Sequence, residues 1–140
     1  MKTQGVKRMD SFRYSHIHIN TSDMDKALAF YQRMFGAKVV SRGQNLPGRT
    51  TAALDISGFR LLISDKLYPL GSPVRGGDSS PHLGLEHFGL ETDDFDQAIV
   101  DLKAKGAEFL MEPHEFRQGF RIAFVKAPDD VRIEIQGRTD

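Results

Sequence analysis

The chain has 140 residues, of which 39% are hydrophobic and 27% charged, and its 19 basic side chains balance 19 acidic ones. This composition is that of one ordinary globular domain, and the zero net charge argues against nucleic acid or an acidic membrane as partner. There is no cysteine, which excludes disulfides and thiolate metal sites. Histidine, aspartate and glutamate remain as possible metal ligands.

No apolar run is long enough to span a bilayer, and Met1–Arg13 has basic residues without the apolar core of a secretory signal. We therefore expect a cytoplasmic protein. Residues 1–11 are polar and lack periodicity, so they are expected to form a flexible tail before a single domain over 12–140.

One stretch of the sequence occurs twice at a constant offset, first as Ser15–Leu28 and then as Glu86–Ile99. The identical pairs are His16 and His87, Thr21 and Thr92, Asp23 and Asp94, Asp25 and Asp96, and Ala27 and Ala98. Each copy keeps a histidine, a turn and a helix start together, which indicates a repeat of structure.

The first half predicts the order β-α-β-β-β. Alternation over 14–20 is typical of a strand with His16, His18 and Asn20 on one face. The cap residues of 21–23, with a capping box from Ser22 to Asp25, begin a helix that runs to Phe35 and ends at a left-handed Gly36. Three more strands are expected, over residues 37–41, 50–56 and 59–64, with a turn over 43–48.

The second half repeats this order after a linker of prolines, glycines and serines over 66–83. A strand over 85–91 precedes a helix that is capped by Asp93 or Asp94 and ends at Gly106. The remaining elements are strands over 107–111, 120–126 and 131–136, separated by turns over 112–119 and 127–130.

These elements predict an α+β fold of two tandem βαβββ modules, the first over about 12–65 and the second over about 84–138. Each module would form a four-stranded sheet covered on one face by its helix. The uncovered faces of the curved, mixed sheets would form a cleft, because a sheet open on one side shows such clean alternation.

The paired modules, the two strand histidines and the closing stretch Ala127–Ile135 resemble the vicinal oxygen chelate superfamily. This superfamily includes glyoxalase I, methylmalonyl-CoA epimerase, extradiol dioxygenases, fosfomycin-resistance enzymes and bleomycin-binding proteins. The resemblance covers 12–138 and implies that His16, His87 and Glu134 bind a divalent metal. At the fourth ligand position, where glyoxalases and epimerases usually carry glutamate or glutamine, this chain has Leu62, which cannot coordinate a metal.

Two histidines and one carboxylate leave coordination positions open and suit Fe(II), followed by Mn(II), Zn(II) or Ni(II). A small substrate would bind such a metal through two adjacent oxygens. The resemblance therefore implies a metal-dependent enzyme of the glyoxalase/dioxygenase type, with dioxygenation slightly favoured. The alternatives are a glyoxalase- or epimerase-type lyase or isomerase, a fosfomycin-type thiol transferase, and a metal-free binding protein that confers resistance.

An isomerase would be favoured if Ser64 or Asp65 supplied a fourth ligand, although Asp65 faces away from Leu62. The resemblance also implies a homodimer, and it leaves open whether modules are exchanged between the two chains.

Further residues are expected at the cleft. His18, on the same face as His16, is the candidate catalytic residue, since it could hydrogen-bond a substrate or move a proton. Arg132 should share the face of Glu134 and could hold an anionic group. The other candidate substrate-binding residues near the cleft mouth are Arg121, Phe120 and His114. The alternative for His18 is a partly exposed polar residue that lines the cleft. For the arginines and His114 it is an exposed surface residue, and for Phe120 a core residue.

Overall fold

The computed structural model describes Gly5 and residues 11–139, so most of the predicted flexible tail lies outside the described residues. The elements in chain order are β1 (Ile17–Asn20), α1 (Met24–Phe35), β2 (Lys38–Leu46), β3 (Arg49–Ile56), β4 (Phe59–Ser64), β5 (Phe88–Glu91), α2 (Phe95–Ala104), β6 (Glu108–Arg117), β7 (Phe120–Ala127), the 3-10 turn η1 (Pro128–Asp130) and β8 (Val131–Arg138). None of the helices in this described part is long and apolar enough to cross a membrane.

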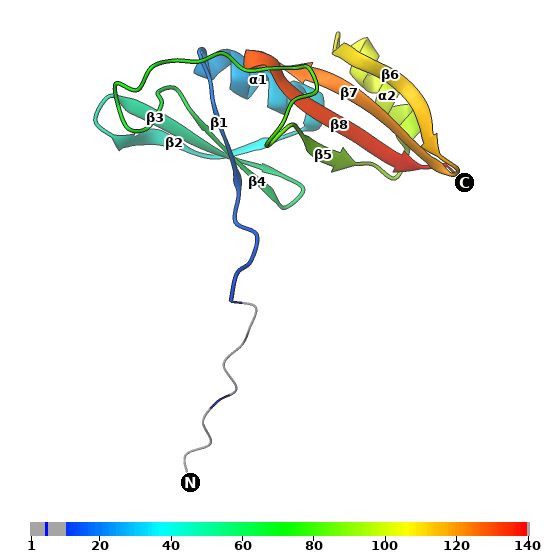
Figure 1. Cartoon of the computed structure of the whole chain (residues 1–140), viewed down its shortest axis with the longest axis horizontal. Helices are drawn as coiled ribbons and strands as arrows, with labels where there is room; N and C mark the ends of the chain where they lie inside the picture. Colours follow the sequence, from blue (N-terminus) through cyan, green and yellow to red (C-terminus); the bar gives the residue numbers. More distant parts are fainter. Residues whose placement is uncertain (1–4, 6–10, 140) are drawn as a thin grey trace.

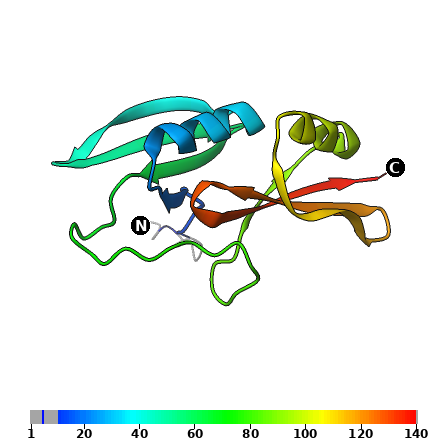
Figure 2. The same cartoon turned by 90° about the horizontal axis from the view of Figure 1, so that it is seen from above.

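The strands form two four-stranded sheets, with orders β1-β4-β3-β2 and β5-β8-β7-β6. In each sheet the first strand pairs in parallel with the last strand of its module, and the other neighbours are antiparallel. Figure 1 shows the two sheets in opposite halves of the molecule, and Figure 2 shows the long linker on the side away from α1 and α2. The predicted α+β fold of tandem βαβββ modules is confirmed.

Both helices begin and end with equivalent signals. Asp23 and Asp94 are the N-caps, and their carboxylates accept hydrogen bonds from the backbone amides of Lys26 and Gln97, each at 3.1 Å. Gly36 follows α1 with φ of 65°, a left-handed conformation that glycine adopts without steric cost. The cap of α1 is thus Asp23 and not Ser22, whose side chain bonds elsewhere.

The predicted turns over 43–48 and 112–119 are wrong in extent. β2 and β6 continue through most of these residues, and each chain reversal occupies only residues 47–48 or 118–119. Both are edge strands with register shifts, which accommodate polar residues and Pro113 without breaking the pairing to β3 and β7. In contrast, β1 is shorter than predicted, because its pairing with β4 begins only at Ile17 and Leu61.

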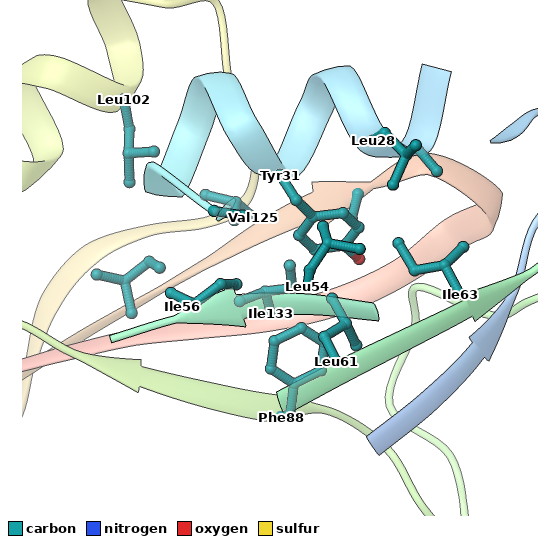
Figure 3. Packing of buried hydrophobic residues seen from close by; sticks show 14 of the residues in the cluster. Leu28, Tyr31, Leu54, Ile56, Leu61, Ile63, Phe88, Leu102, Val125 and Ile133 are labelled. Carbon is teal, nitrogen blue, oxygen red and sulfur yellow. The ribbon is translucent and has the colours of Figure 1, made fainter. Parts of the chain in front are cut away.

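One hydrophobic core joins the two modules (Figure 3). Tyr31 of α1 is 0% exposed and packs in the same cluster as Leu61 of β4 and Ile133 of β8. The rings of Phe59 and Phe88, one from each module, stack with centroids 5.5 Å apart. Burial of this shared apolar surface fixes how the modules sit against each other.

A polar contact adds to this packing. Asp129 in η1 accepts hydrogen bonds from the Thr21 hydroxyl at 2.8 Å and the Ser22 hydroxyl at 2.6 Å, at the turn before α1. The repeated turn of module one is therefore held by module two.

Candidate metal centre

The parallel pairing of β5 with β8 brings His87 and Glu134 together. Gly89 lies opposite Glu134 in this ladder, and His87 immediately precedes β5. Ile133 and Ile135 point into the core, so Glu134 between them points to the open face of the sheet. Its Oε2 lies 3.0 Å from His87 Nε2. The structure therefore joins the second and third of the predicted metal ligands.

Glu86 fixes the orientation of the His87 ring. Its Oε1 lies 3.1 Å from His87 Nδ1, while Phe124 meets the ring edge to face at a centroid distance of 5.0 Å. The hydrogen bond to His87 and the nearby Arg132 guanidinium lower the pKa of Glu86 below its usual value, so it is a carboxylate at neutral pH. Because Glu86 occupies Nδ1, Nε2 is the ring nitrogen that remains available to bind a metal beside Glu134.

This donor set fits a divalent metal. A metal-binding histidine almost always donates its second ring nitrogen to a carboxylate, which sets the tautomer and raises the basicity of the ligating nitrogen. His87 has that arrangement, with Glu86 on one ring nitrogen and a carboxylate oxygen beside the other. Imidazole nitrogen together with carboxylate oxygen suits Mn(II), Fe(II) and Zn(II).

Arg132 is a buried cation beside this pair. It is 6% exposed, and its guanidinium carbon lies 3.9 Å from the centroid of the Phe124 ring. Its Nη1 is 3.1 Å from Glu86 Oε1, which is ion-pair distance. The approach is not aligned for a hydrogen bond, however, and Nε and Nη1 are both buried without a hydrogen-bond partner in the described part of the chain. Arg132 thus retains donors for a bound group.

A cavity of about 360 Å³ brings three of the predicted site residues together, namely His18, His87 and Arg132. The linker closes one side of it through Gly76, Gly77 and other residues. A side chain at position 77 would place its Cβ only 2.0 Å from the Asp129 carbonyl oxygen, so only glycine allows the linker to lie this close.

His16 does not join the pair. It is exposed, and Ser15 Oγ lies 2.8 Å from its Nδ1. Within residues 11–139 no group of three histidine, aspartate or glutamate side chains is close enough to hold a metal ion. One chain therefore assembles two of the three predicted donors.

His18 takes part in a different polar cluster, on the open face of the first sheet. Its Nε2 lies 2.8 Å from the Ser64 hydroxyl, which is 2.7 Å from the Thr51 hydroxyl, and 3.5 Å from Arg49 Nη2. Burial, the charge of Arg49 and the nearby His16 lower the pKa of His18, which favours the neutral imidazole. Leu62 lies opposite His18 in the β1–β4 ladder.

The other predicted substrate-binding residues lie outside this cavity. Arg121 forms an ion pair with Asp96 and stacks over Phe95, so it faces α2 and not the open side of the sheet. Phe120 contacts Arg117 at the end of its hairpin. His114 is exposed on the edge strand β6, with Nδ1 2.9 Å from the Glu112 carbonyl oxygen.

Sequence reasoning missed Glu86 and Arg49. Glu86 directly precedes the repeated histidine, so its position next to a ligand was available as a signal. Arg49 fell between the predicted turn over 43–48 and the predicted strand over 50–56, so it was assigned to no strand face. Once β3 is recognised as starting there, alternation places Arg49 and Thr51 on the face shared with Leu62 and Ser64.

Comparison with known proteins identifies the family. The model of the Glyoxalase/Bleomycin resistance protein/Dioxygenase superfamily matches residues 13–135, and the chain belongs to this superfamily. The predicted resemblance to the vicinal oxygen chelate proteins is thereby confirmed.

Two curated relatives are enzymes. Lactoylglutathione lyase GLX1 of Arabidopsis thaliana is 27% identical over 129 residues, covering 91% of this chain and 45% of that protein. Mitochondrial methylmalonyl-CoA epimerase of Homo sapiens is 32% identical over 105 residues, covering 71% of this chain and 57% of that protein. The chain thus spans about half the length of these relatives.

Solved structures show the same fold. The fosfomycin resistance protein FosX of Listeria monocytogenes superposes with a TM-score of 0.67 at 21% identity, covering 91% of this chain and 94% of that one. Another structure of FosX contains Mn(II) and sulfate. The relatives named here are a lyase, an epimerase and a resistance protein, so they give no specific support to the expected dioxygenation.

Proposed function

We propose that this protein is a metal-dependent enzyme whose small substrate binds the metal through two adjacent oxygens. The metal would be held by His87 and Glu134 of one chain and by His16 of the partner subunit in a homodimer. The observation that carries the proposal is the His87–Glu134 pair at 3.0 Å, with Glu86 on the opposite ring nitrogen of His87. The exposure of His16 leaves it accessible to a second chain.

Each neighbouring residue then has a role that follows from its contacts. Glu86 is a positioning residue that holds the ligating tautomer of His87. Arg132 offers its buried donors to an anionic part of the substrate. In a site that takes His16 from the partner subunit, the neighbouring His18 of the partner subunit, with its neutral imidazole, would be placed to accept a proton from bound substrate. The metal would supply Lewis acidity that polarises the chelated oxygens.

The reaction we propose is a lyase or isomerase reaction, ahead of dioxygenation. The similarity to lactoylglutathione lyase and methylmalonyl-CoA epimerase supports this order, since such chemistry moves a proton next to a polarised oxygen. Leu62 counts against this order, because the site would have three protein ligands and would lack the fourth that glyoxalases and epimerases usually carry. The presence of Mn(II) in a FosX structure supports Mn(II) beside Fe(II) as the metal to test first, followed by Zn(II) and Ni(II).

Metal content tests the proposal directly. Purified protein incubated with Mn(II) or Fe(II) and then desalted should retain metal, and His87→Ala and Glu134→Gln should lose it. His114→Ala is the matched control, because His114 is an exposed histidine of the same sheet. A wild-type protein that retains none of these metals would instead be a metal-free binding protein, and the enzyme proposal would fail.

Mixed dimers test whether the site is shared between chains. A dimer of one His16→Ala chain and one His87→Ala chain contains one intact ligand set if His16 comes from the partner subunit. The same dimer contains no intact set if all ligands belong to one chain. We therefore expect the mixed dimer to recover metal that neither homodimeric variant retains. Failure to recover it would show that the site is not shared.

A further inference from the structure

The open face of the first sheet holds a buried cation with no acidic partner. Arg49, the first residue of β3, is 7% exposed. Its Nε donates to the Lys66 carbonyl oxygen at 2.9 Å, and its guanidinium lies 5.9 Å from the centroid of the Tyr68 ring. No carboxylate among the described residues is within ion-pair distance of it. An unpaired buried charge costs folding free energy, and a bound anion would offset that cost.

The surroundings of Arg49 form a cavity of about 320 Å³. Its polar lining consists of His18, Asn20, Asn45, Arg49, Thr51 and Tyr68, and its apolar lining residue is Leu62. The lining contains amides, hydroxyls, an imidazole and a guanidinium, but no carboxylate. These groups offer hydrogen-bond donors around a single positive charge. The chemistry is therefore complementary to an anion and not to a metal ion.

We propose that this cavity is a subsite for an oxyanionic group of the substrate, a carboxylate or a phosphoryl or phosphonyl group. Arginine provides a planar fork of donors that matches two oxygens of such a group, and a charge-assisted hydrogen bond is stronger than a neutral one. The tie from Arg49 Nε to Lys66 fixes the fork in place before a ligand arrives.

The subsite lies next to the proposed metal position. His16 and His18 are two residues apart along the chain, a separation of about 6–7 Å in an extended strand. A substrate chelated beside His16 would therefore reach the Arg49 cavity on the same sheet face with its anionic end. This step rests on the proposed function and defines the substrate class as small oxyanions that also carry two adjacent oxygens. Binding of an anion at Arg49 does not require the metal.

The test uses full-length protein freed of metal with a chelator. Acetate, phosphate and methylphosphonate are titrated separately at constant ionic strength set with sodium chloride, and the melting temperature and heat of binding are recorded. At least one of these anions should raise the melting temperature of the wild type and bind it saturably. Which anion does so distinguishes carboxylate from phosphoryl or phosphonyl chemistry. Arg49→Gln should weaken that binding about tenfold or more. Equal affinity in Arg49→Gln would overturn the inference.

Arg60→Gln is the matched control, since it removes an exposed arginine of the same sheet outside this cavity. It should bind the anion as wild type does. A loss of equal size in Arg60→Gln would show that general charge, and not the cavity, attracts the anion.

Asn45→Asp keeps the inference testable even if Arg49→Gln does not fold. This change places a carboxylate in the cavity beside Arg49, so the protein should keep or raise its melting temperature and stop responding to added anion. An unchanged anion response in Asn45→Asp would contradict the inference. Metal retention is measured on a separate portion of each protein after incubation with Mn(II) or Fe(II) and desalting. Wild type that holds metal but no oxyanion would refute the subsite alone, and wild type that binds oxyanion but no metal would refute the proposed function alone.

Discussion

Tyr31 illustrates at the scale of one residue how tightly the shared core is packed. It is fully buried, and its hydroxyl has no hydrogen-bond partner in the part of the chain that the structure describes. Burial and the nearby Asp129 raise the pKa of this hydroxyl, so it stays neutral. A buried polar group without a partner costs free energy, which its removal would recover.

We therefore expect Tyr31→Phe to leave the free energy of unfolding unchanged or to raise it by about 1 kcal/mol. Tyr31→Ala should lower it by roughly 3–5 kcal/mol, because a large cavity remains at the centre of the core. Urea unfolding followed by circular dichroism measures both. A Tyr31→Phe protein destabilised by more than about 1 kcal/mol would show that the hydroxyl is bonded, to a water molecule for example.

Glu86 is a second residue whose contribution, in this case to metal affinity, can be measured by one substitution. Because it holds the Nδ1 side of His87, Glu86→Ala should reduce metal affinity by about 10–100-fold while His87 and Glu134 remain. Competition with a fluorescent chelator gives the affinity. Glu91→Gln, an exposed change on β5, is the control and should keep wild-type affinity. An unchanged metal affinity in Glu86→Ala would show that Glu86 does not support metal binding by His87.

At the scale of the elements, the two helix caps should be energetically equivalent. Asp23 and Asp94 make the same 3.1 Å bond to the amide three residues on, so Asp23→Ala and Asp94→Ala should each cost about 1 kcal/mol of stability. Asp93→Ala is the control, since Asp93 is exposed and is not the cap of α2. Chemical denaturation of the three variants measures the difference. A loss in Asp93→Ala as large as in Asp94→Ala would contradict the assignment.

The repeat made most elements predictable from sequence. Helix ends depend on neighbouring residues, and so Gly36, Gly106 and the capping aspartates marked them correctly. Strand ends depend on partners that are distant in sequence. Residues 43–46 and 112–117 contain turn-forming residues, yet they extend β2 and β6 because β3 and β7 offer continuous pairing partners.

The candidate site was predictable only in part, for the same physical reason. His87 immediately precedes β5, and Glu134 lies on β8, its parallel partner. The repeat located His87, and the family resemblance located Glu134. His16 belongs to the other sheet, and only the three-dimensional packing of the modules shows that it is separate from the pair. The buried position of Arg49 depends on β2, β4 and the linker together, which no local pattern encodes.

At the scale of the whole molecule, Asp129 couples the modules in a pH-dependent way. Burial alone would raise the pKa of Asp129, but hydrogen bonds from Ser22 and Thr21 and the charge of Lys26 outweigh it and lower the pKa below its usual value. A carboxyl group with a lowered pKa in the folded state adds stability above its unfolded pKa of about 3.9. It loses that stability as the pH falls through its folded value.

Asp129→Asn should therefore lower stability at pH 7 by on the order of 1 kcal/mol, a modest amount because the carboxylate is only partly buried. The difference from wild type should shrink as the pH is lowered below about 4. Urea midpoints measured between neutral and acidic pH test this, with Asp93→Asn as a control of equal charge change. A difference between Asp129→Asn and wild type that stays constant across this range would exclude the linkage.

The core shared by the modules has a consequence for the continuity of the chain. The linker between β4 and β5 carries exposed residues such as Val74 and Leu83, whereas the contacts of Phe59 with Phe88 and of Asp129 with Thr21 and Ser22 do not depend on it. A protease that cuts near Val74 should therefore produce two fragments that remain associated and unfold together in one transition. Although the sequence is a duplication, we expect the two modules to remain one cooperative folding unit after the chain between them has been cut.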